Sequence, residues 1–142
     1  MSININKKKG FRGYIFSRSF MEERVPQHVQ NIIIRDYCSK KDMHYLLSAS
    51  EYAMDNSTLM LRQLVKDLPT MDGIVAYSIF QMPENDDERK SIFKSVLLLK
   101  KEIHFAVEGL SLYDNDSYNH IENIWQVKKT LPNCNFLEII KN

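Results

Sequence analysis

The chain has 142 residues, of which 44% are hydrophobic and 26% charged, a composition typical of one globular domain with a hydrophobic core. Its 19 basic and 18 acidic residues leave a formal net charge of +1, so the chain as a whole lacks the positive field on which nucleic-acid affinity largely depends. No apolar stretch approaches the roughly 20 residues of a membrane span, and we expect no membrane partner.

The cysteines and histidines show no metal-binding pattern. Cys38 and Cys134 fit no metal spacing, and His28, His44 and His120 have no ligand spacing with one another, so we expect no metal. The chain lacks a glycine-rich phosphate loop, which argues against a dinucleotide or P-loop nucleotide, and we expect no cofactor. No signal-peptide pattern opens the sequence, so the expected location is the cytoplasm.

The first half of the chain predicts two strands and two helices. Gly13–Phe16 is a short apolar strand, and residues 26–41 carry apolar side chains at helical spacing behind a proline suited to a first turn. Tyr45–Ser48 is a second strand. Thr58–Leu68 repeats the helical spacing, and Pro69 ends it.

The second half predicts two further strands and two further helices. Gly73–Ser78 is mostly apolar, as in a strand buried on both faces of a parallel sheet. Residues 86–101 form a predicted helix that begins with three carboxylates, which suit its positive end. Ile103–Val107 is the fourth strand, and residues 114–130 hold a weaker helical pattern. Phe136–Ile140 is either a terminal strand or an apolar tail.

This alternation predicts a single α/β domain over residues 1–142. Strand–helix–strand units with short connections form right-handed crossovers, so we expect three layers and a mainly parallel sheet of four or five strands. Residues 1–9, with their basic run, are expected to be a flexible tail. Residues 113–142 are expected to add a C-terminal helix and an apolar tail.

The order and spacing of these elements resemble the catalytic domain of serine recombinases, the resolvase–invertase family, over roughly residues 13–112. The resemblance implies that fold without that chemistry. In the family's first strand an arginine and then a serine follow a tyrosine at alternate positions, whereas here Phe16 and Arg18 follow Tyr14. The loop after the central strand lacks the family's arginines, and in its place stand Phe80, Gln81 and Glu84. Because those arginines would offset the charge that builds on a phosphodiester, we do not expect DNA recombination.

Short motifs between Gly10 and about Leu112 resemble a second family more specifically. The motifs are Gly10–Ile15 with Ser17-Arg18, Val25–Asn31, Arg35–Cys38, Leu47–Met54, Tyr77–Pro83 and His104–Gly109. They are similar to sporadic carbohydrate cluster proteins, which occur among bacterial genes for surface polysaccharides. The resemblance implies a setting in polysaccharide biosynthesis and no particular reaction.

Polar side chains follow the predicted strands at their carboxyl ends, where open parallel sheets bind ligands. After the first strand, Ser17 and Arg18 predict an anion site in which the guanidinium and hydroxyl hold a phosphate or carboxylate. The alternative is a turn whose serine caps the next helix. After the second strand, Ser48, Glu51 and Tyr52 reach the same edge. Glu51 is either a base or hydroxyl acceptor, or a solvated loop carboxylate.

Three more candidates follow the later strands. Tyr77 either stacks on a sugar or base or packs in the core, and Ser78 stands next to it. Glu108 closes the fourth strand and would make an acid–base pair with Glu51 if the fold brings them together. Otherwise it caps a helix or pairs with Arg18.

We therefore predict a small enzyme of bacterial surface-polysaccharide or unusual-sugar biosynthesis that acts on a sugar phosphate, nucleotide sugar or related polyhydroxy acid. Whether it is catalytic at all stays open. The catalytic candidates are Glu51, Glu108 and Ser17; the substrate-binding candidates are Arg18, Ser48, Tyr52, Tyr77 and Ser78.

Two alternatives belong to other classes. One is a non-catalytic protein that docks on a carbohydrate-biosynthesis enzyme, or on a second copy of itself, through Trp125, Phe136 and Ile139. The other is a relic recombinase-like DNA binder without recombinase activity, although the near-zero net charge disfavours nucleic acid.

Overall fold

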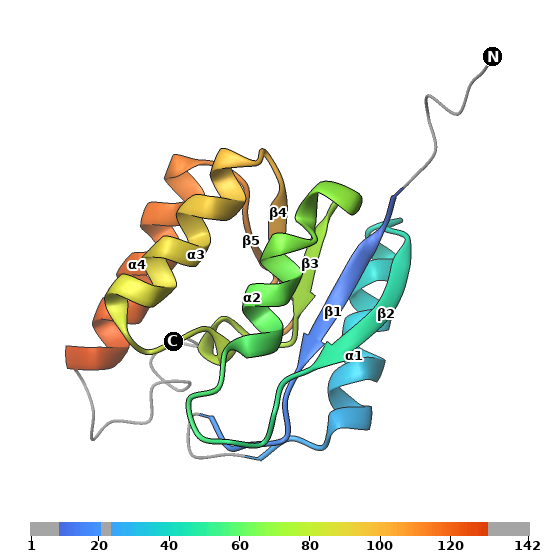
Figure 1. The fold of residues 1–142 in the computed structure, drawn as a ribbon, viewed down its shortest axis with the longest axis horizontal. Coiled ribbons are helices and arrows are strands. Elements are labelled where there is room, and N and C mark those ends of the chain that lie inside the picture. Colours follow the sequence, from blue (N-terminus) through green and yellow to red (C-terminus); the bar gives the residue numbers. More distant parts are fainter. Residues whose placement is uncertain (1–8, 21–23, 131–142) are drawn as a thin grey trace.

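The computed structural model describes residues 9–20 and 24–130, and the strands in these ranges form one five-stranded sheet. They are β1 (Phe11–Ile15), β2 (Tyr45–Ser50), β3 (Gly73–Ala76), β4 (Glu102–Phe105) and β5 (Leu110–Leu112). They lie side by side in the order β2-β1-β3-β4-β5, with neighbours among the first four strands parallel and β5 antiparallel to β4 (Figure 1).

Helices cover both faces of this sheet. They are α1 (Gln27–Lys40), α2 (Leu59–Lys66), α3 (Asp86–Leu98) and α4 (Asn115–Thr130), with short 3₁₀ turns η1 (Leu68–Thr70) and η2 (Ile79–Gln81). Helix α1 packs on one face, and α2, α3 and α4 pack on the other (Figure 1). The predicted fold class, a three-layer α/β domain with a mainly parallel sheet, is confirmed.

Strand β3 shows how the sequence divides its apolar residues between two cores. Side chains alternate along a strand, so Ile74 and Ala76 join the larger cluster beneath α2–α4, whereas Val75 joins the smaller cluster beneath α1. All three are fully buried. The α1 cluster also holds Ile34 and Cys38, four residues apart on one helix face.

The central strand is shorter than the predicted Gly73–Ser78. It ends at Ala76 because the next two backbone N–H groups turn away from the sheet and donate to the side-chain oxygen of Gln81, at 3.0 Å from Tyr77 and 3.3 Å from Ser78. The chain therefore leaves β3 directly into η2, which Ser78 caps.

The fifth strand of the described residues lies where the sequence predicted no strand. β5 is a three-residue strand that follows a turn in which Gly109 adopts a positive φ of 66°, a conformation that favours glycine. Only Leu112 of the three is buried, so the segment carries little apolar signal. The candidate strand 136–140 and residues 1–8 of the expected flexible tail lie outside the described residues.

Trp125, expected as a partner contact, is fully buried in α4 with its ring 5.4 Å from that of Phe80. It belongs to the core and is unavailable to a partner. Phe136 and Ile139, the other two residues of that prediction, fall outside the described ranges.

A buried arginine joins α3, α4 and the loop that precedes α3. The Arg89 side chain is inaccessible to solvent, and its Nε and Nη2 each donate to Glu122 over 2.7 Å. Nη2 also donates to Asp86 at 2.8 Å, and Nη1 donates to the carbonyls of Pro83 at 3.1 Å and Glu84 at 3.2 Å. Since a buried charge is tolerated only when it is paired and hydrogen-bonded, this arrangement fixes where α4 docks.

None of the helices in the described part of the chain is both long and apolar enough to traverse a lipid bilayer.

We expect Arg89→Ala to reduce the free energy of unfolding by about 3–5 kcal/mol, because it leaves the buried Glu122 carboxylate unpaired. Arg89→Lys should recover little of this loss, since an ammonium cannot replace the five fixed donors of a guanidinium. Urea denaturation followed by circular dichroism measures both. As a control, Lys40→Ala removes an exposed pair with Asp36 and should cost less than about 1 kcal/mol. Similar losses for Arg89→Ala and Lys40→Ala would contradict this assignment.

Candidate functional site

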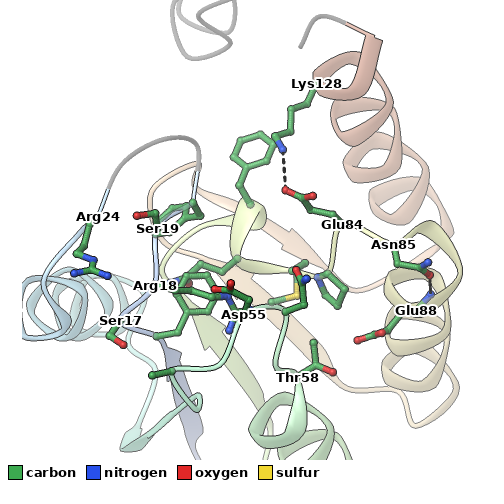
Figure 2. A pocket seen from close by; sticks show the side chains of 18 residues that line it. Ser17, Arg18, Ser19, Arg24, Asp55, Thr58, Glu84, Asn85, Glu88 and Lys128 are labelled. Atoms are coloured by element: carbon green, nitrogen blue, oxygen red, sulfur yellow. Dashed lines mark hydrogen bonds and ion pairs between the residues drawn. The ribbon is translucent and has the colours of Figure 1, made fainter. Parts of the chain in front are cut away.

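A cavity of about 500 Å³, here called the site cavity, lies at the carboxyl end of β1. Its walls come from the segments that follow the first three strands together with the start of α3 and the end of α4 (Figure 2). Because parallel strands direct their carboxyl ends to one edge, segments far apart in sequence meet here. The lining includes residues 16–20, Arg24, Ala53, Asp55, Asn56, Thr58, residues 80–85, Glu88 and Lys128.

The site cavity carries charges of both signs. Its cationic groups are Arg18, Arg24 and Lys128, and its carboxylates are Asp55, Glu84 and Glu88. One pair is formed across the wall, with Lys128 Nζ 3.5 Å from Glu84 Oε1 (Figure 2).

Arg18 is held in the cavity by an aromatic ring. Its guanidinium carbon lies 4.2 Å from the ring centroid of Phe16, a cation–π arrangement. Its Nη1 is buried without a hydrogen-bond partner among the described residues. Ser17 lines the same cavity. It does not cap α1, which was the alternative role considered for this serine. Pro26 occupies that N-cap, with no side-chain hydrogen bond.

Glu51 binds the first turn of α2. The residue is 4% exposed, and its carboxylate accepts hydrogen bonds from the hydroxyls of Tyr14 at 2.9 Å and Ser57 at 2.8 Å. It also accepts from the backbone N–H groups of Met60 at 3.1 Å and Leu61 at 3.2 Å. Burial by itself would raise the pKa of Glu51, but these donors outweigh it and hold the pKa below its usual value. The carboxylate is therefore ionised, buried and fully engaged, and it does not line the site cavity.

The neighbouring phenol is a fixed donor to this carboxylate. Burial, and then the charge of Glu51, raise the pKa of Tyr14 far above its usual value, against a smaller opposing effect of Arg18. The Tyr14 hydroxyl therefore stays protonated at any physiological pH.

Glu108 and Ser78 hold the turn η2. Glu108 accepts from the Ser78 hydroxyl at 2.7 Å and from the backbone N–H of Ile79 at 3.0 Å, while Ser78 Oγ accepts from the N–H of Phe80 at 3.1 Å. Burial raises the pKa of Glu108 despite these donors. Glu108 thus acts as a cap at η2, whereas Glu51 caps α2 through different donors.

The remaining predicted residues lie apart from the cavity. Ser48 donates to Asn31 of α1 at 2.7 Å, on the other face of the sheet from α2. Tyr52 is 53% exposed and does not line the cavity. Tyr77 packs with the α1 cluster and lies 6.0 Å, ring to ring, from Phe20. Of the eight predicted site residues, the structure brings Ser17 and Arg18 together in the cavity, and the functional roles of all eight stay predictions.

Sequence reasoning missed a buried amide pair beside the cavity. Gln30 Nε2 donates to the carbonyls of Phe16 and Val25, both at 2.8 Å, and Gln81 Nε2 donates to Gln30 Oε1 at 2.8 Å. These bonds tie the segment after β1 to the turn after β3. The sequence did hold one signal: Gln30 stands four residues before Ile34 on the buried face of α1, an unusual place for a polar side chain.

Among residues 9–20 and 24–130, no cluster of three or more His, Cys, Asp or Glu side chains is arranged to hold a metal ion.

The fold has clear neighbours among solved structures. A resolvase-family site-specific recombinase from Streptococcus pneumoniae superposes with a TM-score of 0.62 at 8% identity, covering 84% of this chain and 89% of that one. The N-terminal catalytic domain of TP901-1 integrase gives a TM-score of 0.59 at 12% identity, covering 85% of this chain and 95% of that one. Likeness at such low identity shows a common fold alone, and it confirms the resolvase-like architecture.

No family model matches the chain, and no curated protein matches it significantly. The resemblance to sporadic carbohydrate cluster proteins therefore finds no support in these comparisons.

We expect Glu51→Gln to lower the free energy of unfolding by about 1–3 kcal/mol at pH 7, because an amide cannot accept all the hydrogen bonds that converge on this carboxylate. Folding lowers the pKa of Glu51. The stability that its ionised carboxylate contributes is therefore fully present above the ordinary glutamate pKa of about 4.3, and it is lost as the pH falls through the lower pKa of the folded state. Urea denaturation of both proteins from pH 7 to pH 3 should show the difference narrowing in the acid range. Asp36→Asn, at an exposed carboxylate, is the matched control and should differ little at any pH. A Glu51→Gln difference that is absent, or that grows on acidification, would contradict this role.

Proposed function

We propose that this chain binds a small polyhydroxy ligand bearing a phosphate or carboxylate, with Arg18 holding the anionic group in the site cavity. The observation that carries the proposal is the placement of Arg18: its guanidinium lines a cavity at the carboxyl edge of a parallel sheet and has a nitrogen without a partner. A guanidinium presents a planar set of donors that matches the oxygens of phosphate and carboxylate.

The hydrogen-bond donors of the site favour an anionic ligand. A buried donor without an acceptor costs about 1–3 kcal/mol, and an anion would recover this cost once the Arg18 side chain turns Nη1 toward the cavity. The Ser17 and Ser19 residues line the cavity on the same segment, and their hydroxyls are further donors. Stacking on Phe16 limits the conformations of the guanidinium before any ligand arrives.

The carboxylates of the cavity restrict the rest of the ligand. Asp55, Glu84 and Glu88 would repel a polyanion, whereas a carboxylate oxygen without a partner can accept a hydrogen bond from a sugar hydroxyl. Glu84 is already paired with Lys128. This mixture of charges supports a ligand with one anionic end and a hydroxyl-bearing body. Sugar phosphates and sugar acids are such ligands, and an enzyme of polysaccharide biosynthesis would use them. Because the carboxylates of Glu51 and Glu108 cap turns, the proposal is one of ligand binding and assigns no catalytic residue.

A thermal-shift screen with sugar phosphates, nucleotide sugars and sugar acids tests this proposal. A ligand at about 100 times its Kd should stabilise the fold by about 2.7 kcal/mol, which corresponds to several degrees in melting temperature. Arg18→Ala should abolish the shift. Arg35→Ala, an exposed arginine on α1 outside the cavity lining, is the matched control and should keep it. The absence of any shift across the panel, or an equal shift in Arg18→Ala, would refute the proposal.

The likeness to two recombinase structures favours a second candidate, a DNA binder that keeps the fold without the reaction. If the chain binds DNA, the fluorescence anisotropy of labelled duplex DNA rises when the protein is added. The logarithm of the affinity would then fall with the logarithm of the salt concentration, with a slope of about −0.9 for each phosphate contacted. Given the net charge of +1 and the cavity's carboxylates, we expect no such binding between 50 and 200 mM salt. A tight, steeply salt-dependent affinity would replace the first proposal with this one.

A further inference from the structure

Glu88 is the second residue of the site cavity with an unsatisfied polar atom. It stands in the first turn of α3, where the Asn85 side chain accepts from its backbone N–H at 2.9 Å. One carboxylate oxygen, Oε2, lies 3.2 Å from Nη2 of Arg62. The other, Oε1, is buried and has no hydrogen-bond partner in the part of the chain that the structure describes.

The two unsatisfied atoms of the cavity are complementary. Arg18 Nη1 is a donor without an acceptor, and Glu88 Oε1 is an acceptor without a donor. Since each lacks a partner, they do not satisfy one another. They reach the cavity from different elements, Arg18 from the segment after β1 and Glu88 from α3 (Figure 2). A ligand that satisfies both must carry an acceptor group at one end and a hydrogen-bond donor elsewhere.

Glu88 differs in this respect from the other carboxylates near the strand ends. Glu84 also lines the cavity, but its side chain is 74% exposed and pairs with Lys128, so water and a cation already satisfy it. Glu51 is fully engaged at α2. The Glu88 side chain is 29% exposed, so it borders the cavity while Oε1 itself is covered. The terminal torsion of a glutamate is broad, and the pair that Oε2 forms with the exposed Arg62 side chain is weak. A rotation can therefore turn Oε1 toward a ligand, at the expense of that pair, without moving the helix.

We infer that Glu88 is a specificity-determining residue that accepts a hydrogen bond from a hydroxyl of the ligand whose anionic group Arg18 holds. The inference rests on the proposed function and deepens it, because it divides recognition between an anion-binding arginine and a hydroxyl-binding glutamate. Glu88 thereby selects phosphorylated or carboxylated ligands with a hydroxyl-bearing body over the bare anion.

The effects of Glu88→Ala on the affinities for inorganic phosphate and for a sugar phosphate distinguish this role from a structural one. Removing a carboxylate near the cavity lowers the repulsion felt by a bare anion, so inorganic phosphate should bind Glu88→Ala at least as well as it binds the wild type. A sugar phosphate should lose the hydrogen bond to a charged acceptor, which corresponds to about a tenfold or greater loss of affinity. General damage to the fold would weaken both ligands together.

Isothermal titration calorimetry with inorganic phosphate, glucose 1-phosphate and ribose 5-phosphate makes the comparison. The proteins are the wild type, Arg18→Ala, Glu88→Ala and the matched control Glu84→Ala, with melting temperatures recorded without ligand. Glu88→Met, which keeps the length of the side chain but has no strong acceptor, serves if Glu88→Ala does not fold. We expect at least one sugar phosphate to bind the wild type more tightly than inorganic phosphate does. Glu88→Ala should remove this preference, and Glu84→Ala should keep it.

The two hypotheses fail differently. If no probe binds in a manner that depends on Arg18, the proposed function is wrong and the inference falls with it. If probes bind through Arg18 but no sugar phosphate is preferred over inorganic phosphate, or Glu88→Ala changes both affinities by the same factor, the inference alone is wrong. An equal loss of preference in Glu84→Ala would also overturn it, because the effect would then be one of general charge.

Discussion

The hydrogen bonds of one buried guanidinium determine the shape of the site. Each nitrogen of Arg89 has an oxygen acceptor, and its carbon lies 4.6 Å from the Trp125 ring centroid. Two of those acceptors are the main-chain carbonyls of Pro83 and Glu84, in the loop that walls the cavity. Because a buried charge cannot give up its partners without a large cost, the loop, α3 and α4 keep their positions together. The cavity is thus bordered by a rigid wall.

The polar groups at the carboxyl edge divide into those that hold the fold and those that keep an unsatisfied atom. The segment that leaves a parallel strand often begins a helical turn, and the first N–H groups of that turn need acceptors. Glu51 and Glu108 meet this need at α2 and η2. A carboxylate near a strand end is therefore as suited to capping as to catalysis. Arg18 and Glu88 each retain a polar atom that the described part of the fold does not satisfy.

The sequence predicted the layers and most elements because apolar periodicity is a local property. It placed the first four strands and all four helices, but it did not find β5, whose three residues carry too little pattern. The same limit applies to the site. Ser17 and Arg18 adjoin a strand end, so local reasoning brought them to the cavity. Glu88 was interpreted only as a favourable charge at a helix start, since its place in the cavity depends on how α3 docks. The Gln30–Gln81 pair joins residues 51 positions apart, a relation that no local pattern contains.

The carboxyl edge of the sheet has the architecture seen in recombinase folds, but its residues hold the turn after β3. At positions where the resemblance to serine recombinases sets an aspartate and two arginines, Phe80 packs against Trp125, and Gln81 holds Gln30 and the end of β3. Glu84, at the third position, pairs with Lys128. Restoring one arginine there would not recreate a phosphodiester site, because a guanidinium in place of Gln81 would lose the acceptor that ends β3 and would enter a buried amide network without a carboxylate to balance its charge. In this cavity Arg18 supplies a cationic group from a different segment, so a resolvase-like fold does not by itself imply resolvase-like chemistry at this edge.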